Sequence, residues 1–302
     1  MEEKINRICN ILLNIGEMSK YKNIATIGKS IRRPGNHNFS ASNVSSNSVG
    51  TSIDPVISID HFEIRKATFP PHPHAVFSAV TYLFEDGEGE FVSRDSTGGH
   101  HVSKPGGVIW NVAGSGVMHE EYPKVQGELS HGLQMFVNLS SANKMQKPHV
   151  FFVDGPDIPT FSKDGVKVRV IAGEFQNMKA KIQPPGNITY LDIFLSPRKE
   201  VEIPLSANNR TLLYFISGGA KVGNEDKWLE APDASILTDD ADTVFIKTEE
   251  SEVHLVLVAG EPTNEPIIAH GPFVMNTMEQ INDAIIRYQN GSMGYLASTN
   301  SF

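Results

Sequence analysis

Residues 70–74 read Pro-Pro-His-Pro-His, and residues 117–121 read Val-Met-His-Glu-Glu. Each stretch carries two candidate metal ligands separated by one residue, namely His72 and His74, then His119 and Glu121. Side chains on a β-strand alternate between its two faces, so residues i and i+2 point the same way. Two such pairs on neighbouring strands would bring three imidazoles and one carboxylate to a common point. The spacing therefore predicts a mononuclear metal site built on a β-fold.

This donor set suits a divalent first-row metal, because imidazole binds iron, copper, nickel and zinc and a carboxylate adds charge. Three nitrogens and one oxygen leave one or two octahedral positions open, so Fe(II) is the leading candidate. Affinity alone ranks copper and nickel higher, so other divalent first-row metals stay open. A lone His-x-His pair arises by chance in a chain with 11 histidines, and the flanking prolines would also suit a rigid turn. Only the two pairs together carry the prediction.

From residue 55 onward, short runs of strand-forming residues alternate with clusters of Gly, Pro and Asp. Strands are predicted, among others, over residues 75–84, 107–112, 133–139, 190–195, 212–217 and 253–259. Many short strands with regular turn signals indicate a sandwich or barrel rather than a doubly wound sheet. His131 and His254 lie inside such strands and are interpreted as hydrogen-bonded structural groups.

The strand list divides into two comparable halves. Residues 79–87 are similar to 211–219, and 131–137 are similar to 252–258, which predicts two β-barrels in tandem. The second half has no counterpart of the four ligands and is expected to be a metal-free scaffold or pocket wall. The predicted domains are an N-terminal helix with an Asn/Ser-rich loop, a metal-binding barrel, and a second barrel with a terminal helix, over residues 1–52, 53–150 and 151–302.

Helical spacing of apolar residues recurs at both ends of the chain. Ile5, Ile8, Leu12 and Ile15 predict a short amphipathic N-terminal helix. Residues 36–52 are dominated by Asn and Ser, which predicts a surface loop or partly disordered insert. Met278, Ile281, Ile285 and Tyr288 predict a C-terminal helix that ends before Gly291. The fold class is therefore mainly all-β, with one helix at each end.

Composition narrows the classes of partner. A net charge of −9 argues against sequence-independent binding to nucleic acid and against binding to an anionic membrane surface. No apolar run approaches the roughly 20 residues of a membrane span. The single cysteine excludes an intramolecular disulfide, and the N-terminus lacks a secretory pattern. We expect a cytoplasmic protein with a small-molecule substrate, no direct nucleic-acid binding and no membrane association.

The chain resembles the pirin family, a branch of the bicupins in the cupin superfamily. The segments that carry this resemblance are residues 69–74, 80–83, 94–96, 104–110, 113–121, 131–134, 137–139, 265–268 and 271–277. The resemblance as a whole runs from about Pro55 to Gly294, and it leaves the N-terminal helix and the Asn/Ser-rich insert outside the common pattern.

The resemblance implies one Fe(II) in the N-terminal cupin, bound by three His and one Glu that match His72, His74, His119 and Glu121. Several pirins resemble quercetin 2,3-dioxygenases in activity, which implies a flavonol-like aromatic substrate and dioxygen. Glu121 would then take the proton of the substrate 3-hydroxyl, and the ring would open with loss of carbon monoxide. Eukaryotic pirins are known as transcriptional cofactors, so a non-enzymatic iron-binding redox sensor with a protein partner is the alternative. A purely structural metal is the third interpretation.

The residues around the ligands depart from the family pattern. After the His-x-His pair the family usually has Arg-Gly-Phe-Glu-Thr, whereas residues 75–79 here read Ala-Val-Phe-Ser-Ala. The family His before Arg-Asp-Ser is Ser93 in this chain. Such outer groups orient and tune metal ligands. The resemblance therefore implies a complete ligand set in altered surroundings.

Overall fold

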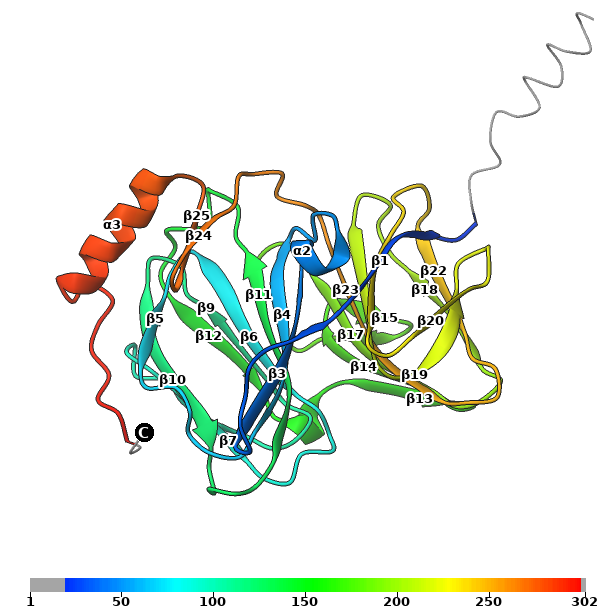
Figure 1. Cartoon of the computed structure of the whole chain (residues 1–302), viewed down its shortest axis with the longest axis horizontal. Coiled ribbons are helices and arrows are strands. Elements are labelled where there is room, and N and C mark those ends of the chain that lie inside the picture. Colours follow the sequence, from blue (N-terminus) through cyan, green and yellow to red (C-terminus); the bar gives the residue numbers. More distant parts are fainter. Residues whose placement is uncertain (1–19, 300–302) are drawn as a thin grey trace, which may run out of the picture.

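The computed structural model describes residues 20–299 and shows two β-rich halves side by side (Figure 1). The predicted class is confirmed: the chain is mostly strands, with two tandem cupin-type halves. The predicted N-terminal helix lies outside the described residues. None of the helices within 20–299 is long and apolar enough to cross a membrane.

The N-terminal half contains two antiparallel sheets. The first has the order β12-β9-β6-β11-β4-β3-β2 and the second β5-β10-β7-β8. The strands of the seven-stranded sheet are β2 (Ile31–Arg32), β3 (Phe39–Ser45), β4 (Val56–Ile64), β6 (Phe77–Leu83), β9 (Val108–Val112), β11 (Ser130–Asn138) and β12 (His149–Val153). Those of the four-stranded sheet are β5 (His72–His74), β7 (Phe91–Asp95), β8 (His100–Ser103) and β10 (Val117–Pro123).

The C-terminal half is built on a ten-stranded sheet with the main path β1-β21-β19-β23-β17-β14-β13. Its strands are β1 (Ile24–Lys29), β13 (Thr160–Lys163), β14 (Val166–Ala172), β17 (Thr189–Leu195), β18 (Glu200–Pro204), β19 (Arg210–Val222), β20 (Lys227–Glu230), β21 (Asp233–Leu237), β22 (Thr243–Lys247) and β23 (Val253–Gly260). The smaller elements are η1 (Gly155–Asp157) and the hairpin of β15 (Glu174–Phe175) and β16 (Met178–Lys179).

One hydrophobic core joins the two halves. Val80 and Tyr82 of β6 belong to the same buried cluster as Tyr190 and Val256 of the C-terminal sheet. The alternate residue Thr81 faces the other way, into the N-terminal half. All seven residues of β6 are buried as a result. A strand covered on both faces reads as a continuous apolar run, which is why this stretch shows little alternation.

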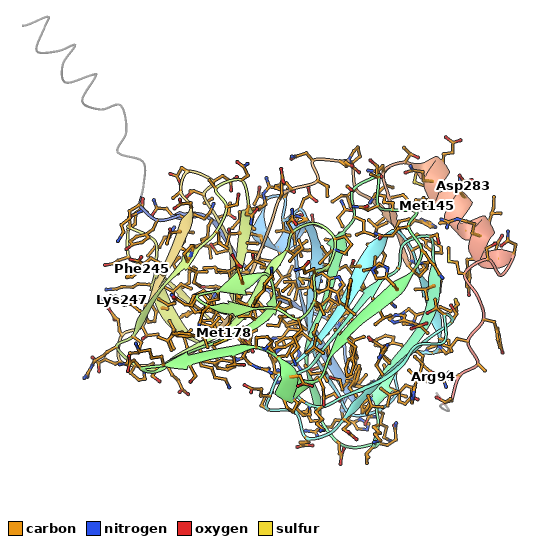
Figure 2. All side chains as sticks on the ribbon, turned by 180° about the vertical axis from the view of Figure 1, so that it is seen from behind. Arg94, Met145, Met178, Phe245, Lys247 and Asp283 are labelled. Atoms are coloured by element: carbon orange, nitrogen blue, oxygen red, sulfur yellow. The ribbon has the colours of Figure 1, made fainter. Side chains whose placement is uncertain are left out.

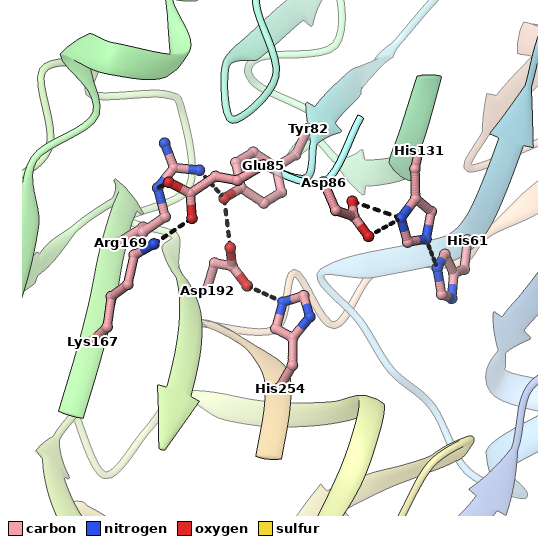
Figure 3. A network of polar contacts seen from close by, with 9 residues as sticks. All are labelled: His61, Tyr82, Glu85, Asp86, His131, Lys167, Arg169, Asp192 and His254. Atoms are coloured by element: carbon pink, nitrogen blue, oxygen red, sulfur yellow. Dashed lines mark hydrogen bonds and ion pairs between the residues drawn. The ribbon is translucent and has the colours of Figure 1, made fainter. Parts of the chain in front are cut away.

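Polar side chains also connect the halves (Figure 3). The Tyr82 hydroxyl donates to Asp192 Oδ2 at 2.6 Å and accepts from Arg169 Nη1 at 2.7 Å. Asp192 Oδ1 lies 2.6 Å from His254 Nε2. His131 Nδ1 lies 2.8 Å from Asp86 Oδ1. His131 and His254 are thus hydrogen-bonded structural groups, as predicted.

Each end of the described chain packs on the half that is distant from it in the sequence. Strand β1 pairs with β21 of the C-terminal sheet. The hairpin of β24 (Ile268–His270) and β25 (Phe273–Met275), together with α3 (Met278–Gln289), packs on the N-terminal half. Ala75 forms an isolated bridge with Phe273, and Ile281 of α3 is buried in the same cluster. The terminal helix was predicted as part of the second domain, yet the apolar surface that covers it belongs to the first.

Figure 2 shows this packing from behind, with Met145 of the N-terminal half beside Asp283 of α3. Both residues line one groove along the helix. The helix itself has the predicted bounds, and the hydroxyl of Thr277 caps it by accepting from the backbone N–H of Gln280.

The prediction of a loop or disordered insert over residues 36–52 is wrong. This segment forms β3 and the short helix α2 (Ser46–Val49). Strand β3 pairs with β4 without interruption from Phe39 opposite Ile64 to Ser45 opposite Ser58. The sheet supplies partners for the backbone and buries Ala41 and Val44, so tertiary pairing overrides the low strand propensity of Asn and Ser.

Candidate metal centre

Three histidines converge at the end of the four-stranded sheet. Strands β5 and β10 are antiparallel neighbours that place His119 opposite His72 and Val117 opposite His74. One ring nitrogen from each of the three histidines lies within 4.8 Å of the other two. The Nε2 atoms of His72 and His119 are 3.0 Å apart. The structure brings the three imidazoles of the two motifs together, and their role as metal ligands stays a prediction.

Strand alternation decides which residue of 117–121 reaches the centre. Glu120 is adjacent to His119 but lies on the opposite face, where Arg94 Nη2 is 3.6 Å from its carboxylate. The hydroxyl of Ser298, near the end of the described chain, also donates to Glu120. The period of two in the sequence thus separates His119, which faces the pocket, from the buried structural Glu120.

The three imidazoles are held in the neutral form that can bind a cation. Burial lowers the pKa of His72 and holds the pKa of His74 and His119 well below the usual range. His72 Nδ1 lies 2.9 Å from the Pro70 carbonyl oxygen, to which it donates, so Nε2 carries the free lone pair. A backbone carbonyl behind a metal-binding imidazole is a common orienting partner.

The spacing of the nitrogens fits a bound divalent cation. Two nitrogens each about 2.1 Å from a metal and at right angles are about 3.0 Å apart, whereas tetrahedral donors would be about 3.4 Å apart. The observed 3.0 Å between His72 and His119, which is also the length of a hydrogen bond between the two rings, brings both nitrogens close enough to share one cation. With His72 Nε2 as the acceptor, His119 can donate its Nε2–H across this distance in the metal-free site, and a bound cation would replace that proton. His72, His74 and His119 are therefore the residues that would hold the metal.

Glu121 lies in the same pocket but outside the three-histidine group. Its Oε2 atom is 2.7 Å from the hydroxyl of Thr81, which reaches across from β6. Burial raises the pKa of Glu121 to about 7, and hydrogen bonds from Thr81 and Ser93 oppose that rise. The prediction that Glu121 is the fourth ligand stays a prediction.

An apolar pocket of about 430 Å³ opens onto the histidines. Its aromatic lining residues are Phe39, Phe62, Phe69, Phe91 and Phe136. At its mouth Arg33 Nη2 lies 3.1 Å from Asp60 Oδ1, and the Phe69 side chain is exposed. Strand β3 and the chain before it therefore build one wall of the pocket.

Sequence reasoning missed this wall and also missed Thr81 and Gln134. The wall falls in the segment interpreted as a loop, so no signal pointed to it. Thr81 and Gln134 did carry one: each is a polar residue with apolar neighbours on both sides in its strand. They are directly opposite in the β6–β11 ladder, and their side chains hydrogen-bond at 2.7 Å.

The residues that depart from the family pattern surround the centre. Ser93 lies opposite Glu121 in the β7–β10 ladder. Ala75 and Val76 are buried in the cluster that receives α3, and the backbone φ of Val76 is 71°. The pattern has Gly at this position, so Val76 adopts a left-handed conformation that its branched side chain disfavours.

Two similar β-halves with a histidine-lined pocket in the first define the bicupin class. Comparison with protein families then gives the narrower assignment: residues 28–137 match the model described as Pirin, and residues 190–294 match the Pirin C-terminal cupin domain. The chain belongs to the pirin family. The N-terminal match begins at residue 28, so the Asn/Ser-rich segment lies inside the family pattern and not outside it.

Individual relatives agree with the assignment. The chain is 37% identical to human Pirin over 247 residues, which cover 81% of this chain and 84% of that protein. A quercetin 2,3-dioxygenase structure from Acinetobacter baumannii aligns with a TM-score of 0.81 and 28% identity, covering 92% of this chain and 100% of that one. The bacterial pirin YhhW from Escherichia coli, solved in complex with nickel(II), shares the fold with a TM-score of 0.60 and 16% identity, covering 78% of this chain and 98% of that one.

Proposed function

We propose that the protein is a mononuclear Fe(II) dioxygenase that acts on a flavonol-like aromatic substrate, of the quercetin 2,3-dioxygenase type. The observation that carries the proposal is the pocket of about 430 Å³ that connects the solvent with three neutral imidazoles. A site that only stores or senses a metal does not need an aromatic-lined chamber of ligand size. The similarity to a solved quercetin 2,3-dioxygenase supports the same reaction class.

The pocket fits a flat, largely apolar ligand. Phe136 contacts His74, with 5.4 Å between ring centroids, and Phe39 meets Phe69 edge-on at 5.3 Å near the mouth. Phenyl rings at both ends would bind an aromatic ligand by its faces and edges and exclude water from the centre. Arg33 and Asp60 can hydrogen-bond polar substituents at the outer end of the ligand.

A bound Fe(II) would act as a Lewis acid and as a template for the substrate oxygen. The protein supplies the acid–base chemistry. Glu121 is a carboxylate in the pocket, and we assign it as the base that takes the proton of the substrate hydroxyl. A pKa of about 7 suits a group that must accept a proton near neutral pH.

Oxygen consumption tests the proposal. Protein purified without metal is reconstituted with Fe(II) under anaerobic conditions and then mixed with quercetin and dioxygen. We expect oxygen uptake, loss of the flavonol absorbance and release of carbon monoxide, none of which should occur with metal-free protein or with His74→Ala. Bound iron without turnover of any flavonol would refute the enzyme and favour the non-enzymatic redox sensor.

A further inference from the structure

Lys144, in the loop after β11, is a buried lysine without a carboxylate partner. Its side chain is 3% exposed, and its Nζ atom donates to Asn138 Oδ1 at 2.6 Å. Within residues 20–299, Lys144 forms no ion pair. An ammonium group has three protons to donate, and burying it without a counter-charge is costly. The amide of Asn138 therefore holds the side chain in place without balancing its charge.

The neighbouring carboxylates are engaged with other groups. Glu265 accepts from the backbone N–H and the hydroxyl of Ser141, and Asp54 accepts from the hydroxyl of Thr263. Burial lowers the pKa of Lys144 to about 8, and the charges of Glu265 and Asp54 oppose that shift. A neutral amine is a nucleophile, and a buried lysine reaches this form more readily than an exposed one.

Lys144 forms part of the floor of the groove along α3. This groove has a volume of about 450 Å³, and its apolar lining residues are Met145, Met275 and Ile286. Figure 2 shows Met145 of the loop beside Asp283 of the helix. Met145 and Ile286 are exposed, so the groove opens to the solvent. A small molecule that enters the groove meets the Lys144 side chain.

Arg287 adds a second cationic side chain to the same groove. Its Nη1 atom donates to the carbonyl oxygen of Ser115, and in the described part of the chain Arg287 forms no ion pair. Asp283 also lines the groove but pairs with neither Arg287 nor Lys144. The planar guanidinium group is suited to binding a carboxylate. The groove thus combines a buried amine with a group that can bind an organic anion.

We propose that Lys144 is a nucleophilic amine that captures a small aldehyde or ketone as an imine, and that Arg287 binds a carboxylate of the same molecule. The ligand class is therefore a small 2-oxo acid. Lys144 gives one proton to the solvent, and its nitrogen then bonds to the carbonyl carbon. The carbonyl oxygen leaves as water with the two remaining amine protons, so no oxidant or reductant is consumed. None of the three histidines of the metal centre lines this groove, so the capture needs no metal.

Reductive trapping on the full chain tests the proposal. The protein is incubated near neutral pH with glyoxylate and cyanoborohydride, which converts an imine into a stable carboxymethyl amine. Peptide mass analysis then locates the modified lysines. We expect Lys144 to react at least about tenfold faster than Lys147, an exposed lysine of the same loop, because more of Lys144 is uncharged. In the denatured protein the two lysines should react at similar rates.

Two variants test the two residues separately. Lys144→Arg keeps a donor for Asn138 and should lose the fast-reacting site. Arg287→Gln should slow the capture of glyoxylate by at least about tenfold, since a charge-assisted hydrogen bond is lost. The same variant should capture propanal, an aldehyde without a carboxylate, at the wild-type rate, and this rate also reports that the site is folded.

Two results would overturn the proposal. If Lys144 reacts no faster than Lys147 in the folded wild type, Lys144 is only a structural donor to Asn138. This comparison needs no variant, so it stands even if Lys144→Arg does not fold. If Arg287→Gln slows glyoxylate and propanal equally, or slows neither, Arg287 does not recognise a carboxylate and the ligand class is wrong.

Discussion

The Nε2 atoms of His72 and His119 lie 3.0 Å apart across the β5–β10 ladder, close enough for one cation to bridge them. His74 is on the same face of β5 and contacts both rings. Without a cation, one neutral imidazole can donate its Nε2–H to the other at this distance. A divalent metal that binds the folded site and not the unfolded chain is expected to stabilise the protein.

Replacement of His74 by Ala should remove the metal. One of three imidazole donors is lost, so we expect affinity to fall by more than the roughly 10–100-fold that loss of an outer partner costs. Metal content of the purified protein measures the effect, and an exposed histidine changed in His37→Ala is the matched control. Equal metal content in both variants would refute the ligand assignment.

Tyr82→Phe should weaken the interface between the N-terminal and C-terminal halves. The hydroxyl that links Arg169 to Asp192 is lost, and both partners are buried. We expect a decrease of about 1–3 kcal/mol in the free energy of unfolding, measured by denaturant titration. Tyr295 is 85% exposed, so Tyr295→Phe should change stability by less than about 0.5 kcal/mol. Similar losses in the two variants would contradict this role of Tyr82.

Stability should decline in mild acid because of His61. Its Nδ1 is 3.0 Å from the Tyr214 hydroxyl and its Nε2 is 2.7 Å from His131 Nε2. Burial lowers the pKa of His61 to about 4, helped by repulsion from His131 and His254 and opposed by Asp86. The unfolded chain therefore takes up this proton at a higher pH than the folded chain does.

The contribution of His61 is then fully present above about pH 6.5 and is lost as the pH falls toward about 4, by up to about 3 kcal/mol. Unfolding free energies measured across this window should fall less steeply for His61→Gln than for wild type. His100→Gln, a change at an exposed histidine, should keep the wild-type slope. A wild-type slope in His61→Gln would show that other groups cause the acid sensitivity.

Val76→Gly should be nearly neutral, although Val76 is fully buried. Glycine adopts the φ of 71° freely, which recovers about 1–3 kcal/mol of backbone strain. The lost valine side chain costs about 1.5–3 kcal/mol of apolar burial, so the net change should stay within about 1 kcal/mol.

Val80 provides the contrast, because it is equally buried and lies in a regular strand. Val80→Gly recovers no strain and also carries the cost of glycine in a strand, so we expect a loss above about 2 kcal/mol. Thermal unfolding compares the two variants directly. A larger loss from Val76→Gly than from Val80→Gly would show that Val76 is not strained.

Local sequence patterns predicted the structure correctly where the feature depends on a single strand or helix. The i, i+2 spacing placed His119 toward the pocket and Glu120 away from it, because side-chain direction on a strand depends only on sequence position. The apolar spacing from Met278 to Tyr288 likewise located α3 with the correct bounds. Both features follow from backbone geometry within a few residues.

Local sequence patterns gave wrong or no predictions where a strand pairs with a segment that is distant in the sequence. Residues 36–52 look like a loop by composition, yet β4 pairs with β3 and the result is a wall of the pocket. Three features join residues that are far apart in the chain: the pocket wall, the packing of β1 and α3 on the opposite halves, and the contact of Thr81 with Glu121. No local propensity encodes such pairings.

The sequence by itself determined the all-β class, the two-half organisation and the three histidines of the centre, since these depend on period-two spacing and internal similarity. Only the tertiary structure decided the surroundings of that centre: an aromatic chamber above the imidazoles, and hydroxyls of Thr81 and Ser93 on the carboxylate of Glu121. The physical reason is that the spacing within one strand determines which of its residues face the site, whereas the orientation of each side chain depends on contacts with residues of the facing strands.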